Sequence, residues 1–106
     1  MEFTDHDLII AVIDEKLTEN LLDKVDDVGV TGSTIIPGRG RSAFSKLKFM
    51  GITIEPRRDV IIILSTRDKS KKVLNTIKDY GQLHKPGQGI VFVLEVKEAA
   101  GLRLPE

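Results

Sequence analysis

Residues 84–96 read HKPGQGIVFVLEV, and the interpretation of the rest of the chain starts from this stretch. Gly87 and Gly89 flank Gln88, and glycine allows positive φ and a close approach of a ligand to the backbone. Successive N–H groups in such a turn can point at one anion. The β-branched and aromatic run 90–96 predicts a strand directly after this loop. A phosphate site and a plain tight turn both stay open on this stretch alone, because Gly-x-Gly is a weak motif.

Apolar runs and helical periods alternate on the N-terminal side of this stretch. Residues 8–13 and 60–65 are apolar at nearly every position and predict strands covered on both faces, while residues 29–36 predict a turn that passes into a strand. Apolar residues recur with helical spacing between residues 17 and 28 and between residues 73 and 80. With the strand after the glycines, the order is β-α-β-β-α-β. This order predicts the ferredoxin-like α+β fold, an antiparallel sheet with two helices on one face.

Short segments between these elements predict where each one ends. Gly29 is expected to follow the first helix, and Thr66 or Asp68 is expected to cap the second one. Pro37 is expected to interrupt the second strand. Residues 97–100 are expected to form a turn of helix after the last strand.

The predicted sheet has more apolar surface than its own helices can cover. The chain suits a single domain, residues 1–106, and contains no further element to lie on the second face of the sheet. We therefore expect copies of the chain to associate through this face.

The segment between the second and third predicted strands fits neither period. It is interpreted as a flexible loop, about residues 41–58, whose length indicates a functional or mobile segment. Its apolar residues indicate docking, either on the same subunit or on a partner. Its basic residues form either a solvated loop surface or an arm that attracts an anion or a partner. These residues are Arg39, Arg41, Lys46, Lys48, Arg57 and Arg58.

The composition argues against several classes of function. Sixteen basic residues balance sixteen acidic ones and Trp is absent, so nucleic-acid binding is not expected. Cysteine is absent, which excludes disulfides and thiol chemistry. His6 and His84 have no zinc-site spacing and no acid–base pair is evident, so neither a metal site nor catalysis is expected. No apolar run is long enough for a membrane span and the N-terminus is acidic, so a cytoplasmic location is expected.

Three short motifs, in order, resemble those of the PII signal-transduction superfamily. Residues 29–34 (GVTGST) resemble the family's Gly-[Ile/Val]-Thr-Gly-x-Thr after the first helix. Residues 38–41 (GRGR) resemble its Gly-x-Gly-Arg at the entrance of the T-loop, and residues 87–93 (GQGIVFV) resemble its B-loop and last strand. The order and spacing of elements also fit from Leu8 to Arg103. By this resemblance the chain is identified as a member of the superfamily.

The resemblance implies a homotrimeric regulatory protein that is not an enzyme. Members bind adenine nucleotides (ATP, ADP or AMP) in clefts between subunits and control a partner enzyme or membrane transporter through the T-loop, including in nitrogen regulation. Glycine N–H groups suit phosphate oxygens, and arginines can offer them charged forks. Carried over by matching motif, the ligand contacts would be Thr34, Gly38, Gly40, Arg41, Gly87, Gln88, Gly89 and Arg103.

The chain departs from the family pattern at phosphate-binding positions. Ile90 replaces a B-loop lysine, and Gly101 replaces a C-terminal arginine. Each lost charge-assisted bond removes roughly 1.5–3 kcal/mol, so ADP or AMP is expected to compete well with ATP. The T-loop is shorter than usual and has no tyrosine, since the only one is Tyr80, so uridylylation there is not supported.

Three other classes share features with this chain. An acylphosphatase would need an arginine loop after the first strand, where residues 14–16 are Asp-Glu-Lys. A regulatory module of the ACT type, which binds amino acids, would need a glycine there. A ligand-free assembly protein is the third alternative, because two family cations are missing.

Overall fold

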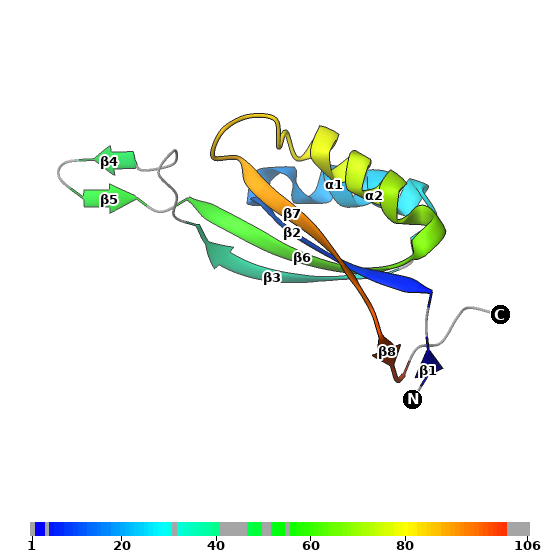
Figure 1. Ribbon diagram of the computed structural model, residues 1–106. Helices are drawn as coiled ribbons and strands as arrows, with labels where there is room; N and C mark the ends of the chain where they lie inside the picture. The colour runs from blue at the N-terminus through cyan, green and yellow to red at the C-terminus, as the bar shows by residue number, and fades with distance from the viewer. Residues whose placement is uncertain are drawn as a thin grey trace.

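The computed structural model describes residues 2–3, 5–30, 32–40, 47–49, 52–54 and 56–101 (Figure 1). In chain order the elements are β1 (Glu2–Phe3), β2 (His6–Asp14), the 3-10 helix η1 (Glu15–Leu17), α1 (Thr18–Asp27), β3 (Ser33–Arg39), β4 (Leu47–Phe49), β5 (Ile52–Ile54), β6 (Arg57–Thr66), α2 (Arg67–Tyr80), β7 (Gly89–Glu95) and β8 (Glu98–Ala99).

The main sheet has four antiparallel strands in the order β3-β6-β2-β7. Both helices lie on one face of it, α1 after β2 and α2 after β6 (Figure 1). The predicted ferredoxin-like α+β fold is confirmed. Two small antiparallel pairs, β1–β8 and β4–β5, are separate from this sheet.

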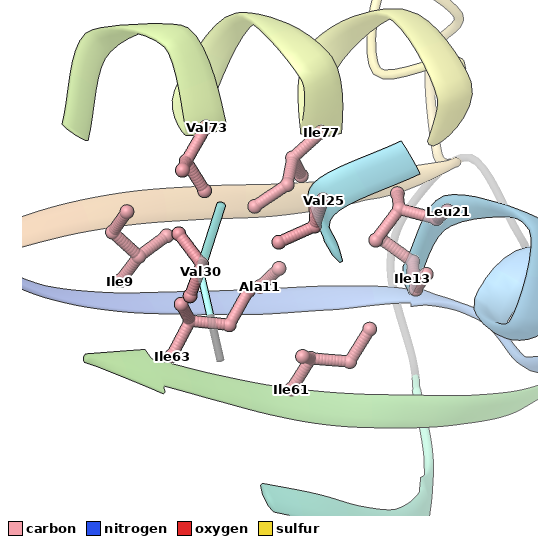
Figure 2. Packing of buried hydrophobic residues seen from close by; sticks show 10 residues of the cluster. All are labelled: Ile9, Ala11, Ile13, Leu21, Val25, Val30, Ile61, Ile63, Val73 and Ile77. Atoms are coloured by element: carbon pink, nitrogen blue, oxygen red, sulfur yellow. The ribbon is translucent and has the colours of Figure 1, made fainter. Parts of the chain in front are cut away.

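The face of the sheet toward the helices carries the core. Burial alternates along β2, where Ile9, Ala11 and Ile13 are fully buried, because successive side chains of a strand point to opposite faces. Ile63 and Ile61 of β6 lie opposite Ile9 and Ala11 and are equally buried. Figure 2 shows the helix side chains that close over them, which are Leu21, Val25, Val73 and Ile77.

The other face of the sheet is apolar, and no helix of the described residues lies on it (Figure 1). Its side chains form three rows across β6, β2 and β7, and we call these nine residues the open face. The rows are Leu64–Leu8–Leu94, Ile62–Ile10–Phe92 and Val60–Val12–Ile90. On β7 the exposed fraction reaches 43% at Phe92 and 51% at Ile90. The expected surplus of apolar sheet surface is therefore present.

Two expectations about the strands were wrong. Pro37 does not interrupt β3, because β3 is an edge strand and pairs only with β6. A proline is tolerated there when its nitrogen, which has no hydrogen to donate, faces away from the sheet. Residues 97–100 do not form a turn of helix, since Glu98 and Ala99 pair with Phe3 and Glu2.

The helix ends agree only in part with expectation. Gly29 follows the C-cap of α1 with φ of 98°, and Lys69 Nζ donates a 3.2 Å hydrogen bond to its carbonyl. Thr66 is the N-cap residue of α2, but its side chain makes no capping hydrogen bond, and Asp68 lies inside the first turn. The N–H of Arg67 instead donates to the carbonyl of Asp5, at 2.8 Å.

The expected long loop is shorter than its predicted bounds of 41–58. Arg57 and Arg58 belong to β6, and β4 and β5 pair as a short ribbon inside the segment. Figure 1 shows this ribbon beyond the end of the main sheet where β3 ends and β6 begins. Residues 41–46, 50–51 and 55 lie outside the described residues, so the expected mobility of the loop stays a prediction.

Candidate functional site

Arg58 lies at the centre of the candidate site, at the start of β6. Its backbone is paired with Gly38 of β3 on one side and with Asp14 of β2 on the other. The residue is only 8% exposed. Within the described part of the chain, its guanidinium forms no ion pair with a carboxylate. It is therefore a buried cation whose partners are neutral.

Those partners are two carbonyl groups of the segment before β7. We call residues 85–89, which lead into β7, the glycine loop. Arg58 Nη2 donates to the Gly87 carbonyl and Nη1 to the Gln88 carbonyl, each at 2.6 Å. The two bonds use the planar guanidinium as a fork. Because β2 lies between β6 and β7 in the sheet, these bonds connect β6 to a segment that leads into a strand that is not its neighbour.

The glycine motif at the end of β3, residues 38–40, contacts the same side chain. A Cβ added at Gly40 would lie 2.8 Å from Arg58 Cγ, a separation that side chains essentially never show. The Gly40 N–H donates to the Pro56 carbonyl at 2.9 Å, just before β6. We call Gly40 and Pro56 the root of the long loop. One side chain thus touches both Gly-x-Gly motifs of the sequence.

The backbone of the glycine loop needs its glycines. Gly87 has φ of 77° and Gly89 has φ of 153°, conformations that other residues rarely adopt. A Cβ at Gly89 would also overlap the carbonyl oxygen of Val12. The Gln88 N–H donates to the Lys85 carbonyl at 3.3 Å. This N–H is therefore already engaged within the loop.

The hydrogen bond from Arg58 to the Gln88 carbonyl also fixes the direction of the Gly89 N–H. In a trans peptide the carbonyl and the following N–H point in opposite directions, and the described residues contain no cis peptide. The Gln88 carbonyl faces Arg58, so the Gly89 N–H points away from the guanidinium. Its direction in the loop is coupled to the bond that Arg58 makes.

The structure brings together five of the eight residues expected to bind a ligand. Gly38 and Gly40 contact or pair with Arg58, and Gly87, Gln88 and Gly89 form the loop that Arg58 holds. Thr34 lies on β3, where it pairs with Ile62 of β6. Strand β3 is at the opposite edge of the sheet from β7. Within one subunit Thr34 is separated from the glycine loop by two strands. Arg41 and Arg103 lie outside the described residues.

Arg58 itself was not predicted as a site residue. The sequence placed it only in the basic cluster of the loop, because the predicted strand began at Val60. Arg58 lies two residues before Val60 on β6, and side chains two residues apart point to the same face of a strand. A predicted strand that began two residues earlier would therefore have placed a charged side chain on the same side as the open face. The contact between its side chain and the glycine loop could not be predicted from the spacing of residues in the sequence.

Away from Arg58, a hollow lies on the helix side, near the start of α1. It has a volume of about 460 Å³. Two of its lining residues are bonded to each other, since the Thr18 hydroxyl donates to Asp59 Oδ2 at 2.6 Å. The lining is dominated by carboxylates, so it does not suit a phosphate group. Its lining residues are Glu15, Lys16, Thr18, Glu19, Ile35 and Asp59.

The comparison with protein families fits this geometry. The family model described as Nitrogen regulatory protein P-II matches residues 6–106. The chain belongs to the P-II family. P-II proteins are regulatory signal transducers rather than enzymes, are generally trimeric and act on partner proteins. No individual curated protein matched the chain.

Membership in the P-II family decides between the classes of protein that share this order of strands and helices. The match spans nearly the whole chain and includes both glycine motifs, so the acylphosphatase and ACT-type alternatives are set aside. No helix in the described ranges is long and apolar enough to cross a membrane. Among the described residues, no three or more His, Cys, Asp or Glu side chains are placed so that they could hold one metal ion.

Proposed function

We propose that this P-II protein is a homotrimer that binds an adenine nucleotide at its subunit interfaces and controls a partner protein through the loop between β3 and β6. The observation that carries the proposal is the position of the glycine loop beside the open face. Gly89 begins β7, and Ile90 and Phe92 of the open face follow at once. A subunit that covers the open face would therefore lie next to the loop.

The trimer is supported by the chemistry of the open face. Nine aliphatic and aromatic side chains in three rows are left without a helix. Burying such side chains contributes about 25 cal/mol for each Å² removed from water. A large exposed apolar surface of this kind marks an interface. A mass measurement by light scattering tests the proposal, with a trimer expected at micromolar concentration and a monomer contradicting it.

The ligand is supported by the glycine loop and by positive charge near it. Gly89 has an N–H that points away from Arg58, and Arg58 itself has no carboxylate partner among the described residues. An anion close to this loop would meet positive potential. The adenine nucleotide is suggested by the family resemblance, and Thr34 would reach it only from a neighbouring subunit, because it lies on the far edge of its own sheet.

Calorimetry with AMP, ADP and ATP tests the ligand. Ile90 and Gly101 stand in place of two cations, so a third phosphate would add charge without a matched donor and would still lose hydration. We expect ADP or AMP to bind at least as tightly as ATP. A clear preference for ATP would show that other cations replace the missing ones. Absence of heat with all three would contradict nucleotide binding.

Partner control is supported by the ribbon β4–β5, which extends beyond the main sheet (Figure 1). The expected partner is a metabolic enzyme or a membrane transporter, as the family resemblance implies. Co-purification from the native host, with wild type and with a variant that lacks residues 43–54, tests this role. We expect a partner to be retained only by wild type, with an amount that changes when ADP is added.

A ligand-free assembly protein is the second candidate. It is favoured by one observation, namely that the Gly87 and Gln88 carbonyls are already satisfied by Arg58 and the Gln88 N–H by Lys85. In this case the loop would be a structural turn. A trimer that gives no heat with nucleotides or amino acids would support this candidate.

A further inference from the structure

We propose that Arg58 couples the root of the long loop to the glycine loop, so that a change at either one is transmitted to the other. The root and the glycine loop are far apart in the sequence but lie at the same end of the sheet, where β3 ends and where β6 and β7 begin (Figure 1). Arg58 is the side chain that touches both.

The contact with the glycine loop is stiff. Hydrogen bonds to a charged group are stronger than those between neutral groups, and a buried cation that loses its partners is strongly destabilising. Arg58 is nine-tenths buried and donates to two carbonyls of adjacent residues at 2.6 Å each. A planar fork bonded to two neighbouring peptides fixes their orientation as well as their position. The guanidinium and the loop should therefore move together.

The contact between Arg58 and the root is steric. Gly40 has no side chain, and the space that a Cβ would need is occupied by Cγ of Arg58, with Cδ at 3.6 Å from the same point. The Gly40 N–H is bonded to the Pro56 carbonyl, so Gly40 cannot retreat without breaking that bond. A displacement of Gly40 toward the sheet must push the stem of Arg58.

The consequence for a ligand rests on the proposed nucleotide site. A phosphate that binds the Gly89 N–H from a new direction would rotate the peptide between residues 88 and 89. That rotation would turn the Gln88 carbonyl away from Arg58 Nη1. Arg58 would then move relative to Gly40. The positions of Gly40 and Pro56, between which the long loop lies, would change with it. Arg58 acts here as a positioning residue, because its route to the ligand runs through the loop.

The first test needs no ligand. Amide resonances of residues 87–89 are compared in Gly40→Ala and Gly38→Ala, since an added Cβ lies 2.8 Å from Arg58 Cγ at the first position and makes only an ordinary 3.7 Å contact with the Arg58 carbonyl at the second. We expect Gly40→Ala to shift the three resonances and Gly38→Ala to leave them close to wild type. Unchanged resonances in Gly40→Ala, with the amides of Ile61 and Ile63 still native, would overturn the proposal.

The second test removes the fork but keeps the charge. Arg58→Lys can reach at most one carbonyl, and Arg57→Lys is the matched control on the exposed neighbouring position. In wild type and in the control, ADP is expected to shift the resonances of both Gly87 and Gly40. In Arg58→Lys the shift at Gly87 should remain and the shift at Gly40 should be lost. A Gly40 response of wild-type size in Arg58→Lys would contradict the coupling.

The two tests separate this inference from the proposed function. If ADP does not bind wild type while Gly40→Ala still shifts the glycine loop, nucleotide binding fails and the coupling stands. If ADP binds while Gly40→Ala leaves the loop unchanged, the nucleotide site stands and the coupling fails.

Discussion

The two faces of the sheet carry the same kind of side chain, but only one of them is covered within the described subunit. Toward the helices, Ile61 and Ile63 are fully buried by residues of the same chain. On the other side, Ile62 lies in a row with Phe92, which is 43% exposed. Burial on the first face is independent of protein concentration, whereas burial on the open face would require a second molecule, which we propose to be another copy of the chain. Apolar composition alone therefore does not reveal which strand residues stabilise the subunit and which would stabilise an assembly.

A charge on the open face should have the largest effect. Phe92→Asp places a carboxylate in the middle row, where association would have to bury it without a partner. We expect the trimer to dissociate into folded monomers and nucleotide binding to be lost with it. Light scattering, circular dichroism and calorimetry with ADP measure the three quantities. Asn75→Asp, at an exposed position of α2, is the matched control and should change none of them.

A cavity on the covered face should destabilise each subunit by a smaller but fixed amount. Ile63→Ala removes a fully buried side chain, and such truncations reduce the free energy of unfolding by about 2–5 kcal/mol. Urea unfolding at two protein concentrations should show the same loss in both. Ile62→Ala, next to it on the opposite face, should show a loss that grows with the concentration of the trimer. Equal behaviour of the two variants would show that the faces do not differ in this way.

The comparison can be sharpened at the two glycine motifs. Gly89→Ala must accept φ of 153° and an overlap with the carbonyl oxygen of Val12, and strain of this kind costs about 1–3 kcal/mol. Gly38→Ala meets only an ordinary contact and should change the free energy of unfolding by less than about 0.5 kcal/mol. Thermal unfolding of both variants measures the difference. Similar stabilities would contradict the described geometry of the glycine loop.

The smallest expected effect concerns the ligand alone. Arg103→Ala should weaken ADP binding by roughly tenfold, which corresponds to about 1.4 kcal/mol and to the loss of one charged hydrogen bond. The mass of the trimer should not change, because the substitution lies after the last residue of β7. Calorimetry with ADP on wild type and on the variant measures the ratio. An unchanged affinity would remove Arg103 from the ligand contacts.

Much of the fold could be predicted because it follows from local patterns. The alternation in β2 and the helical spacing in α1 and α2 each arise within one element, where neighbouring side chains alone set the period. The break expected at Pro37 was wrong for the opposite reason. Whether a strand tolerates proline depends on whether it lies at an edge of the sheet, and the order of strands is a property of the whole domain.

The candidate site also has one part that follows from local sequence and another that depends on the whole domain. The sequence by itself determined the two glycine motifs, since positive φ at Gly87 and Gly89 and close packing at Gly40 and Gly89 are demands that only glycine meets without strain. Only the tertiary structure decided that Arg58 joins them. Its two carbonyl partners follow it by 29 and 30 residues, and nothing in the spacing relates them. The contact exists because α2 returns the chain to the sheet and places β7 beside β2, within reach of a long side chain from β6.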